Sequence, residues 1–150
     1  MGARAKVEID ARPEQVFFVM TDPELSKQWL KGKVETIPVD GPLDRVGARF
    51  KQRFPQGNRW VEYDGQITAY EKGKLFAAEI NNGPFVSHGR YEIERAGAGT
   101  LLHFSIEFHG RTLGGKLLCV FLGVISKLMC RQQVTSLKKF VEERRDSLLV

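Results

Sequence analysis

Two of the three histidines in this chain, His103 and His109, lie with Glu107 in the segment LHFSIEFHG, residues 102–110. Histidine and glutamate bind metal ions and transfer protons, so the segment could carry chemistry. Its β-branched and aromatic residues predict a strand, whose side chains alternate between two faces. The two histidines then share a face, but six residues at roughly 3.3 Å each separate them by about 20 Å. A zinc ligand lies only about 2 Å from its ion. We therefore expect no metal site here, but a solvated polar face.

The other chemistry-bearing residues form no catalytic arrangement that we recognise. All three histidines fall on the outward side of their predicted strands, and only a bulge in NNGPFV would turn His88 inward. No acidic residue alternates inward on the strands predicted at 47–54, 85–93 and 101–109, so no buried general base is visible. The chain also lacks a phosphate-binding loop and a nucleophile elbow. We predict no catalytic residues, no metal and no cofactor.

The even positions of residues 102–108 form an apolar face, and similar alternation recurs along most of the chain. Short segments rich in Gly, Pro, Asn and Lys separate the alternating runs, as expected for hairpin turns. Gly65 and Gly89 fall inside such runs and are expected to mark bulges or sharp bends. The pattern predicts an antiparallel meander, each strand with one apolar face, over residues 6–9, 34–39, 47–54, 59–70, 75–80, 85–93 and 101–109.

Three segments have helical periodicity. DARPEQVFFVMTD, from residue 10, places Pro13 at a first helical position, and PELSKQWL, from residue 23, forms a second short helix. The segment from Thr112 to Leu148 contains no proline and supplies a long helix to cover the apolar side of the sheet. The fold class predicted is α+β: a curved antiparallel sheet of about seven strands around a long C-terminal helix, with two short helices after the first strand.

Length and composition indicate one ligand-binding domain over residues 1–150. The first residues, MGARAKVEID, contain no long apolar run, so we expect no secretory signal. Cys119 and Cys130 are eleven residues apart on the predicted helix, or about 16 Å, which is too far for a disulfide. Two reduced thiols favour a cytoplasmic protein.

The net charge of +5 is modest, and much of it lies late in the chain, at Lys138, Lys139, Arg144 and Arg145. A solvated helix face is the simplest interpretation of these residues. No nucleic-acid-binding motif and no basic run interleaved with aromatic residues accompanies them, so we expect no nucleic acid partner. Transient contact with an anionic membrane surface is the alternative.

A family resemblance enters through residues 9–29, IDARPEQVFFVMTDPELSKQW, in which Asp22, Pro23 and Trp29 follow a strand end and a proline-started helix. Together with Gly47 and LKKF at 137–140, the chain resembles the helix-grip fold of the START and birch-pollen-allergen superfamily (SRPBCC). Within it, the chain is similar to the polyketide cyclase/dehydrase and lipid-transport group. The resemblance implies a tunnel between sheet and long helix that holds an apolar small molecule. It implies no single activity, because the fold hosts carriers, cyclases and chaperone regulators.

The side chains expected to point into that space come from the apolar faces of the strands and from the long helix. Most are aromatic, and the rival interpretation is that they fill an ordinary core. The polar ones need a hydrogen-bond partner, which local protein groups or a ligand could supply. The predicted ligand-binding residues are Phe50, Gln52, Tyr63, Phe76, Phe85, Ser87, Tyr91, Phe104, Leu117 and Phe121.

We therefore predict a binder or carrier of a hydrophobic small molecule such as a lipid, a quinone or a polyketide-like ring. One alternative is a cyclase or dehydratase that uses Tyr63, Tyr91 or a displaced His88 as acid or base. Another is a protein-interaction module that uses residues 117–125, LLCVFLGVI, which are apolar on all sides. The ligand, the oligomeric state and the role of residues 117–125 stay open at this level.

Overall fold

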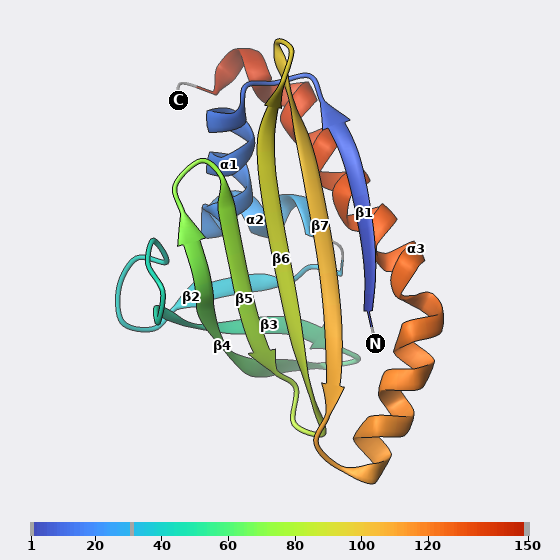
Figure 1. The fold of residues 1–150 in the computed structure, drawn as a ribbon. Coiled ribbons are helices and arrows are strands. Elements are labelled where there is room, and N and C mark those ends of the chain that lie inside the picture. Colours follow the sequence, from blue (N-terminus) through green and yellow to red (C-terminus); the bar gives the residue numbers. More distant parts are fainter. Residues whose placement is uncertain (1, 31, 149–150) are drawn as a thin grey trace.

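A computed structural model describes residues 2–30 and 32–148. Seven antiparallel strands form one strongly bent sheet, two short helices follow the first strand, and one long helix ends the chain (Figure 1). The predicted α+β arrangement is confirmed. The elements are β1 (Gly2–Ile9), α1 (Pro13–Thr21), α2 (Pro23–Trp29), β2 (Glu35–Pro38), β3 (Arg49–Gln56), β4 (Arg59–Glu71), β5 (Leu75–Asn81), β6 (Phe85–Ala96), β7 (Gly99–Gly110), α3 (Leu113–Arg144) and a 3₁₀ turn (Arg145–Ser147).

The strands lie in the order β1-β7-β6-β5-β4-β3-β2, so the meander from β2 to β7 is closed at one edge by the N-terminal strand. Short turns connect the neighbours of the meander, which is why each pair is antiparallel. β1 instead pairs with β7, from Gly2 opposite Glu107 to Ile9 opposite Thr100. The sheet therefore joins the two ends of the chain.

The helices begin where side chains satisfy free backbone amides. Pro13 starts α1, and the side-chain Oε1 of Gln15 accepts a hydrogen bond from the Arg12 amide at 3.0 Å. A carboxylate oxygen of Asp22 accepts from the Glu24 amide at 3.2 Å at the start of α2. Thr112 Oγ1 accepts from the Gly115 amide at 2.9 Å and starts α3. Local sequence thus sets all three starting points.

The long helix α3 crosses the concave side of the sheet along β1 and β7, and its beginning lies beside the turn between β5 and β6 (Figure 1). There the Arg111 amide donates to the Pro84 carbonyl at 2.8 Å. A Cβ added to Gly115 would lie 1.9 Å from that same oxygen, so only glycine permits this approach. Farther along α3, Ser136 Oγ donates to the carbonyl of Trp29. The helix is therefore tied to the rest of the molecule near both ends.

The alternation predicted for β7 is confirmed. Phe104 and Phe108 are buried on the concave side, 6% and 5% exposed. The side chains of His103 and His109 lie on the opposite, convex side and are 44% and 60% exposed. The strand thus has one face in the interior and one in solvent, as half-buried antiparallel strands do.

A bulge in β4 departs from the predicted alternation. The register with β5 shifts between Ile67 and Ala69, whereas Gly65 pairs regularly with Ile80 and Gly89 pairs regularly with Ile106. The expectation was bulges or sharp bends at Gly65 and Gly89, and the regular pairing shows that neither marks a bulge. The extra residue turns Tyr70 to the concave side. Its ring there contacts Phe17, with centroids 5.6 Å apart.

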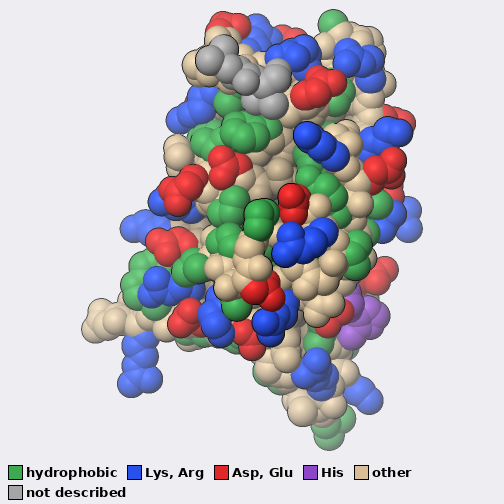
Figure 2. Space-filling model, turned by 90° about the vertical axis from the view of Figure 1, so that its left-hand side faces the viewer, with side chains coloured by type: hydrophobic (Ala, Val, Ile, Leu, Met, Phe, Trp, Pro, Cys, Tyr) green, Lys and Arg blue, Asp and Glu red, His purple; other side chains and the backbone are tan. Residues whose placement is uncertain are grey.

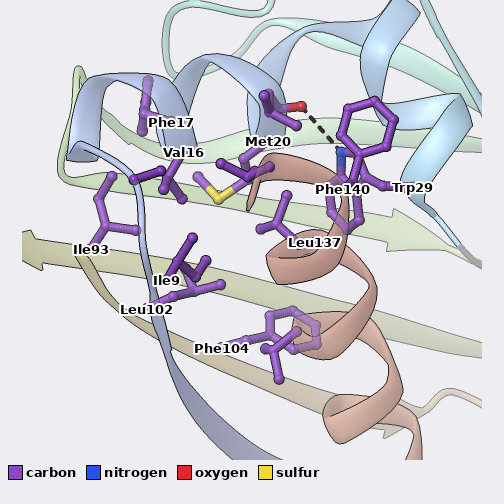
Figure 3. Close-up of a cluster of buried hydrophobic side chains, with 14 of the residues drawn as sticks. Ile9, Val16, Phe17, Met20, Trp29, Ile93, Leu102, Phe104, Leu137 and Phe140 are labelled. Carbon is purple, nitrogen blue, oxygen red and sulfur yellow. Dashed lines mark hydrogen bonds between the residues drawn. The ribbon is translucent and has the colours of Figure 1, made fainter. Parts of the chain in front are cut away.

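One end of the concave side is filled by a hydrophobic core. Side chains from α1, α2, the second half of α3 and three strands point toward one another, and the indole Nε1 of Trp29 donates to the Val19 carbonyl at 3.1 Å (Figure 3). We call this region the closed end. Its labelled members are Ile9, Val16, Phe17, Met20, Trp29, Ile93, Leu102, Phe104, Leu137 and Phe140.

Candidate ligand-binding surface

The other end of the concave side is only partly covered. On the strands that lie beyond the closed end, several side chains on the concave face are only half-buried. A fully packed core would bury such aromatic and aliphatic groups. We call this surface the open end, and it comprises Gln52, Phe54, Tyr63, Ile80, Phe85 and Ser87.

Strand register arranges the concave side chains in rows that run across the sheet. One row carries Phe76, Tyr91 and Phe104 on neighbouring strands, and Tyr91 stacks on Phe104 with ring centroids 4.5 Å apart. Another row, four residues away along each of the three strands, carries Ile80, Ser87 and Phe108. These rows are the bulky walls of the concave side.

Between the two bulky rows lies a row of smaller side chains. Ala78 pairs with Gly89, and Gly89 pairs with Ile106. Both Ala78 and Gly89 are half-buried. The nearest atom to a Cβ added to Gly89 would be Phe104 Cε1 at 3.7 Å, an ordinary contact distance, so there is room above this glycine. A low strip flanked by aromatic rings suits a flat apolar molecule. Neither Ala78 nor Gly89 was among the predicted site residues, because apolar bulk was the signal used.

Two of the four predicted polar residues have protein partners. Ser87 Oγ donates to Asn82 Oδ1 at 3.0 Å. The hydroxyl of Tyr91 accepts from Gln133 Nε2 at 3.2 Å. Burial raises the pKa of Tyr91 to about 12, although the bond from Gln133 acts in the opposite direction. Tyr91 is therefore a neutral phenol near neutral pH, held in place by α3.

The other two polar residues, Gln52 and Tyr63, are a directly opposed pair on β3 and β4. No hydrogen bond joins either side chain to another residue of the described ranges. The Tyr63 ring packs against Phe54, with centroids 5.2 Å apart. An amide and a hydroxyl thus stand half-buried among apolar groups, with their hydrogen-bonding capacity available to water or a ligand.

The bond from Gln133 to Tyr91 also shows which side of α3 faces the concave sheet. Met129 and Leu122 precede Gln133 by four and eleven residues and lie within about 40° of it around the helix, at 3.6 residues per turn. Leu122 is half-buried and Met129 is 38% exposed. These two side chains form the helix contribution to the open end. They were missed because residues 117–125 are apolar on every side and give no direction.

The predicted helix residues Leu117 and Phe121 do not point to the inside. They are 67% and 62% exposed, whereas Cys119 and Cys130 are buried against the sheet. Leu117 and Phe121 lie about 160° from Cys119 around the helix axis, at about 100° per residue. Their expected inward direction was wrong.

The remaining predicted residues lie on the concave side, in different environments. Phe50 is 4% exposed and covers Gly65, while Phe76 contacts Tyr70 at the edge of the closed end. Phe104 also belongs to the closed end. Phe85 lies against Phe108, with centroids 6.0 Å apart, at the open end. The structure thus brings together Gln52, Tyr63, Phe85 and Ser87 and places Phe50, Phe76 and Phe104 in packed surroundings.

All three histidines lie on the convex side. The rings of His88 and His109 are 5.2 Å apart, and His88 Nδ1 lies 3.7 Å from Glu79 Oε2. β6 pairs with β7 without a register shift, so the bulge that could displace His88 inward is not there. Across residues 2–30 and 32–148, no group of three or more His, Cys, Asp or Glu side chains is arranged to hold a metal ion.

A separate groove of about 1150 Å³ runs along the edge strand β1 beside α3. Its lining includes Ala5, Phe104 and Val134 from the interior and Arg4 and Lys127 from the surface. Of the ten predicted ligand-binding residues, only Phe104 contributes to it. This groove is therefore distinct from the open end.

The sequence matches a family model described as polyketide cyclase / dehydrase and lipid transport over residues 2–142. The chain belongs to this family. The recognition made from residues 9–29 and from the order of elements is therefore confirmed. The family and the fold support a hydrophobic-ligand-binding or polyketide-cyclase-like role. No curated protein matches the chain at a significant level.

Solved structures share the fold of this polyketide cyclase/dehydrase and lipid transport family member at low identity. Ara h 8.0201 aligns over 99% of both chains with a TM-score of 0.74 and 14% identity. Protein NE0264 from Nitrosomonas europaea aligns over 96% of both chains with a TM-score of 0.70 and 17% identity. DynU16, from the dynemicin biosynthetic locus, aligns over 97% of this chain and 49% of its own, with a TM-score of 0.67 and 19% identity. The helix-grip fold is thus confirmed.

Proposed function

We propose that the protein binds and carries a hydrophobic small molecule, such as a lipid, a quinone or a polyketide-like ring, on the open end of the concave surface. The observation that carries the proposal is the low strip at Ala78 and Gly89 between two bulky rows. A ligand that covers these apolar groups releases the water beside them. The gain in binding free energy is about 25 cal/mol per Å² of apolar surface buried.

Gln52 and Tyr63 would orient the molecule. A net hydrogen bond contributes only about 0.5–1.5 kcal/mol, less than the burial of an apolar ring. Affinity should therefore follow apolar area, and the polar pair should select ligands that carry a carbonyl or hydroxyl at one end.

Binding is favoured over catalysis by the state of the tyrosines and histidines. Tyr91, with a pKa of about 12 and a hydrogen bond from Gln133, is a poor general acid or base near neutral pH. His88 lies on the convex side, beside Glu79. Of the two tyrosines predicted at the site, Tyr63 has the hydroxyl that makes no hydrogen bond within the described residues, and one such group fits recognition.

The test combines native mass spectrometry of the purified protein with titration by 1-anilinonaphthalene-8-sulfonate. We expect a co-purifying apolar compound, and displacement of the dye by a long-chain fatty acid or a quinone. Gly89→Leu should fill the strip and weaken displacement at least tenfold. Ser105→Leu, on the convex side of β7, is the matched control and should bind as the wild type does. Equal binding by the Gly89 variant would refute the proposal.

A further inference from the structure

The first half of α3 carries a broad apolar stripe that nothing in the described chain covers. Its members lie within an arc of about 100° around the helix, at 3.6 residues per turn. Their side chains are between 53% and 78% exposed. They form one continuous patch, whereas exposed apolar residues on an ordinary surface are scattered singly. We call this set the α3 stripe: Leu113, Leu117, Val120, Phe121, Val124 and Leu128.

The sheet of the same molecule cannot cover the α3 stripe. Cys119 and Ser126, on the far side of the helix, are buried against the sheet. Burying the stripe would require a rotation of roughly half a turn, which would expose them. The contacts of Gly115 with Pro84 and of Ser136 with Trp29 oppose such a rotation. The covering surface must therefore come from outside.

The charged residues that α3 itself carries along the stripe are all positive. Between Glu107 and Glu142 the sequence contains six Lys or Arg residues and no Asp or Glu. Lys116 and Lys127 border the stripe beside Val120, and Arg131 follows it. All three are exposed, and no ion pair joins them to an acid within the described ranges. The ion-paired Lys138, by contrast, lies beyond the stripe.

The groove along β1 adds further basic residues beside the stripe, and its lining also contains Glu92 and Glu107. Arg4 and Lys6 line it together with Lys127 and Arg131, and none of the four has an ion-pair partner among the described residues. Arg90, also in the lining, is neutralised by Glu92 at 2.8 Å. The face seen in Figure 2, in contrast, intersperses both signs of charge. An apolar stripe whose own helix carries only basic charges beside it is the pattern of a helix that lies in a lipid–water interface.

We infer that the α3 stripe docks the protein on the surface of an anionic lipid bilayer. The apolar side chains enter the boundary between headgroups and acyl chains, while Lys116, Lys127 and Arg131 reach the phosphates with their charged ends. By length and composition α3 could cross a membrane, and only 22% of its most apolar 18-residue window is buried. Its other face, however, is packed on the sheet and cannot face lipid. The helix therefore lies on the bilayer without crossing it.

A second copy of this chain fits the α3 stripe less well. A two-fold contact places the same surface against itself, so the basic borders of the two stripes would face each other without any acidic residue between 107 and 142. Anionic phosphates remove that repulsion.

The test is co-sedimentation with vesicles of phosphatidylcholine, with and without phosphatidylglycerol. The wild type should bind the anionic vesicles, lose binding as salt is raised, and bind pure phosphatidylcholine weakly. Phe121→Glu should weaken binding at least tenfold, while Val46→Glu, at an equally exposed position in a loop, should not. Lys127→Ala should weaken binding about fivefold and Lys72→Ala should leave it unchanged.

Thermal unfolding of Phe121→Glu should match the wild type, because its side chain is already in water. Failure of the wild type to bind anionic vesicles, or equal binding by Phe121→Glu, would overturn the inference. So would a solution dimer that Phe121→Glu dissociates and that binds no vesicles. Gly89→Leu should bind vesicles normally, so this inference and the proposed ligand site fail separately.

Discussion

The ring of Phe50 lies directly over Gly65, so that a Cβ added to Gly65 would be 2.3 Å from the ring atom Cζ. The two residues are opposite each other on β3 and β4. Phe50 belongs to a second core cluster with Leu43, Ala48 and Ile67, against which Phe76 and Ala78 pack. A glycine inside a strand here serves packing, because it leaves space for an aromatic ring.

Gly65→Ala should therefore destabilise the protein. The added methyl group has to displace a ring that is only 4% exposed, and overpacking of this kind costs about 1–3 kcal/mol in the free energy of unfolding. Urea unfolding measures the loss. Gly89→Ala is the matched control: its new methyl group meets nothing closer than 3.7 Å, so its unfolding free energy should change by less than about 1 kcal/mol. Equal losses in both variants would contradict the packing role of Gly65.

The buried phenol of Tyr91 should be visible in an alkaline titration. Because its pKa is raised to about 12, its phenolate absorbance should appear near pH 12 and should be missing in Tyr91→Phe. The folded-state pKa lies above the unfolded value near 10. The neutral phenol therefore contributes fully to the free energy of unfolding below pH 10, and this contribution is lost as the pH rises from 10 to 12. A Tyr91 signal near pH 10 in the folded protein would show that the ring is solvated.

Glu142 should make a pH-dependent contribution to the free energy of unfolding. Its partial burial acts to raise the pKa, but hydrogen bonds from the Lys138 ammonium and the Asp10 amide, both at 2.7 Å, outweigh this and lower it. The contribution is then present above the ordinary value of 4.5 and is lost as the pH falls through the lower folded-state pKa. Glu142→Gln should be less stable than the wild type by about 1 kcal/mol at pH 7.

The difference between Glu142→Gln and the wild type should disappear once the pH has fallen below the lowered folded-state pKa of Glu142, where the wild-type carboxylate is protonated. Chemical denaturation at pH 7 and at low pH provides the comparison. Glu143→Gln, with an exposed side chain, is the control and should show no such change. A gap that persists at low pH would assign the effect to shape instead of charge.

The two thiols should react slowly with a disulfide reagent such as Ellman's reagent. Cys119 and Cys130 are both buried, and burial raises the pKa of the Cys130 thiol, which disfavours the reactive thiolate. We expect both to react only after addition of denaturant, with Cys130 the slower. Rapid reaction of Cys130 in the native protein would show that α3 opens away from the sheet.

The strands and their faces could be predicted because period-two alternation has an immediate physical cause: one face is wet and the other is dry. His103 on the outside and Phe104 on the inside follow from that rule alone. The rule failed at Tyr70, because the bulge after Ile67 adds one residue and no local residue type announces it. When alternation is counted along a strand, one inserted residue reverses the predicted face of every residue that follows it.

The face of α3 that packs against the sheet could not be predicted, because the first half of the helix has apolar residues on all sides. What decides the direction is contact: the two cysteines and Ser126 are small enough to let the helix approach β1 and β7. Ser126 can be buried because its hydroxyl donates to the Gly123 carbonyl at 2.9 Å. Leu117 and Phe121 were expected to point inward, whereas close approach of the helix required small residues at the contact.

The pairing of β1 with β7 also has a consequence for how the chain assembles. Every partner of β1 in the sheet lies between Thr100 and Glu107, so on the ribosome the first strand emerges long before its partner exists. The first strand has no sheet partner while the remainder of the meander is synthesised. Its pairing with β7 then depends on contacts that are distant along the chain. The last strand to be made therefore supplies the sheet partner of the first, and a ribosome stalled before position 100 would hold a nascent chain whose first strand has an unpaired edge, which favours aggregation.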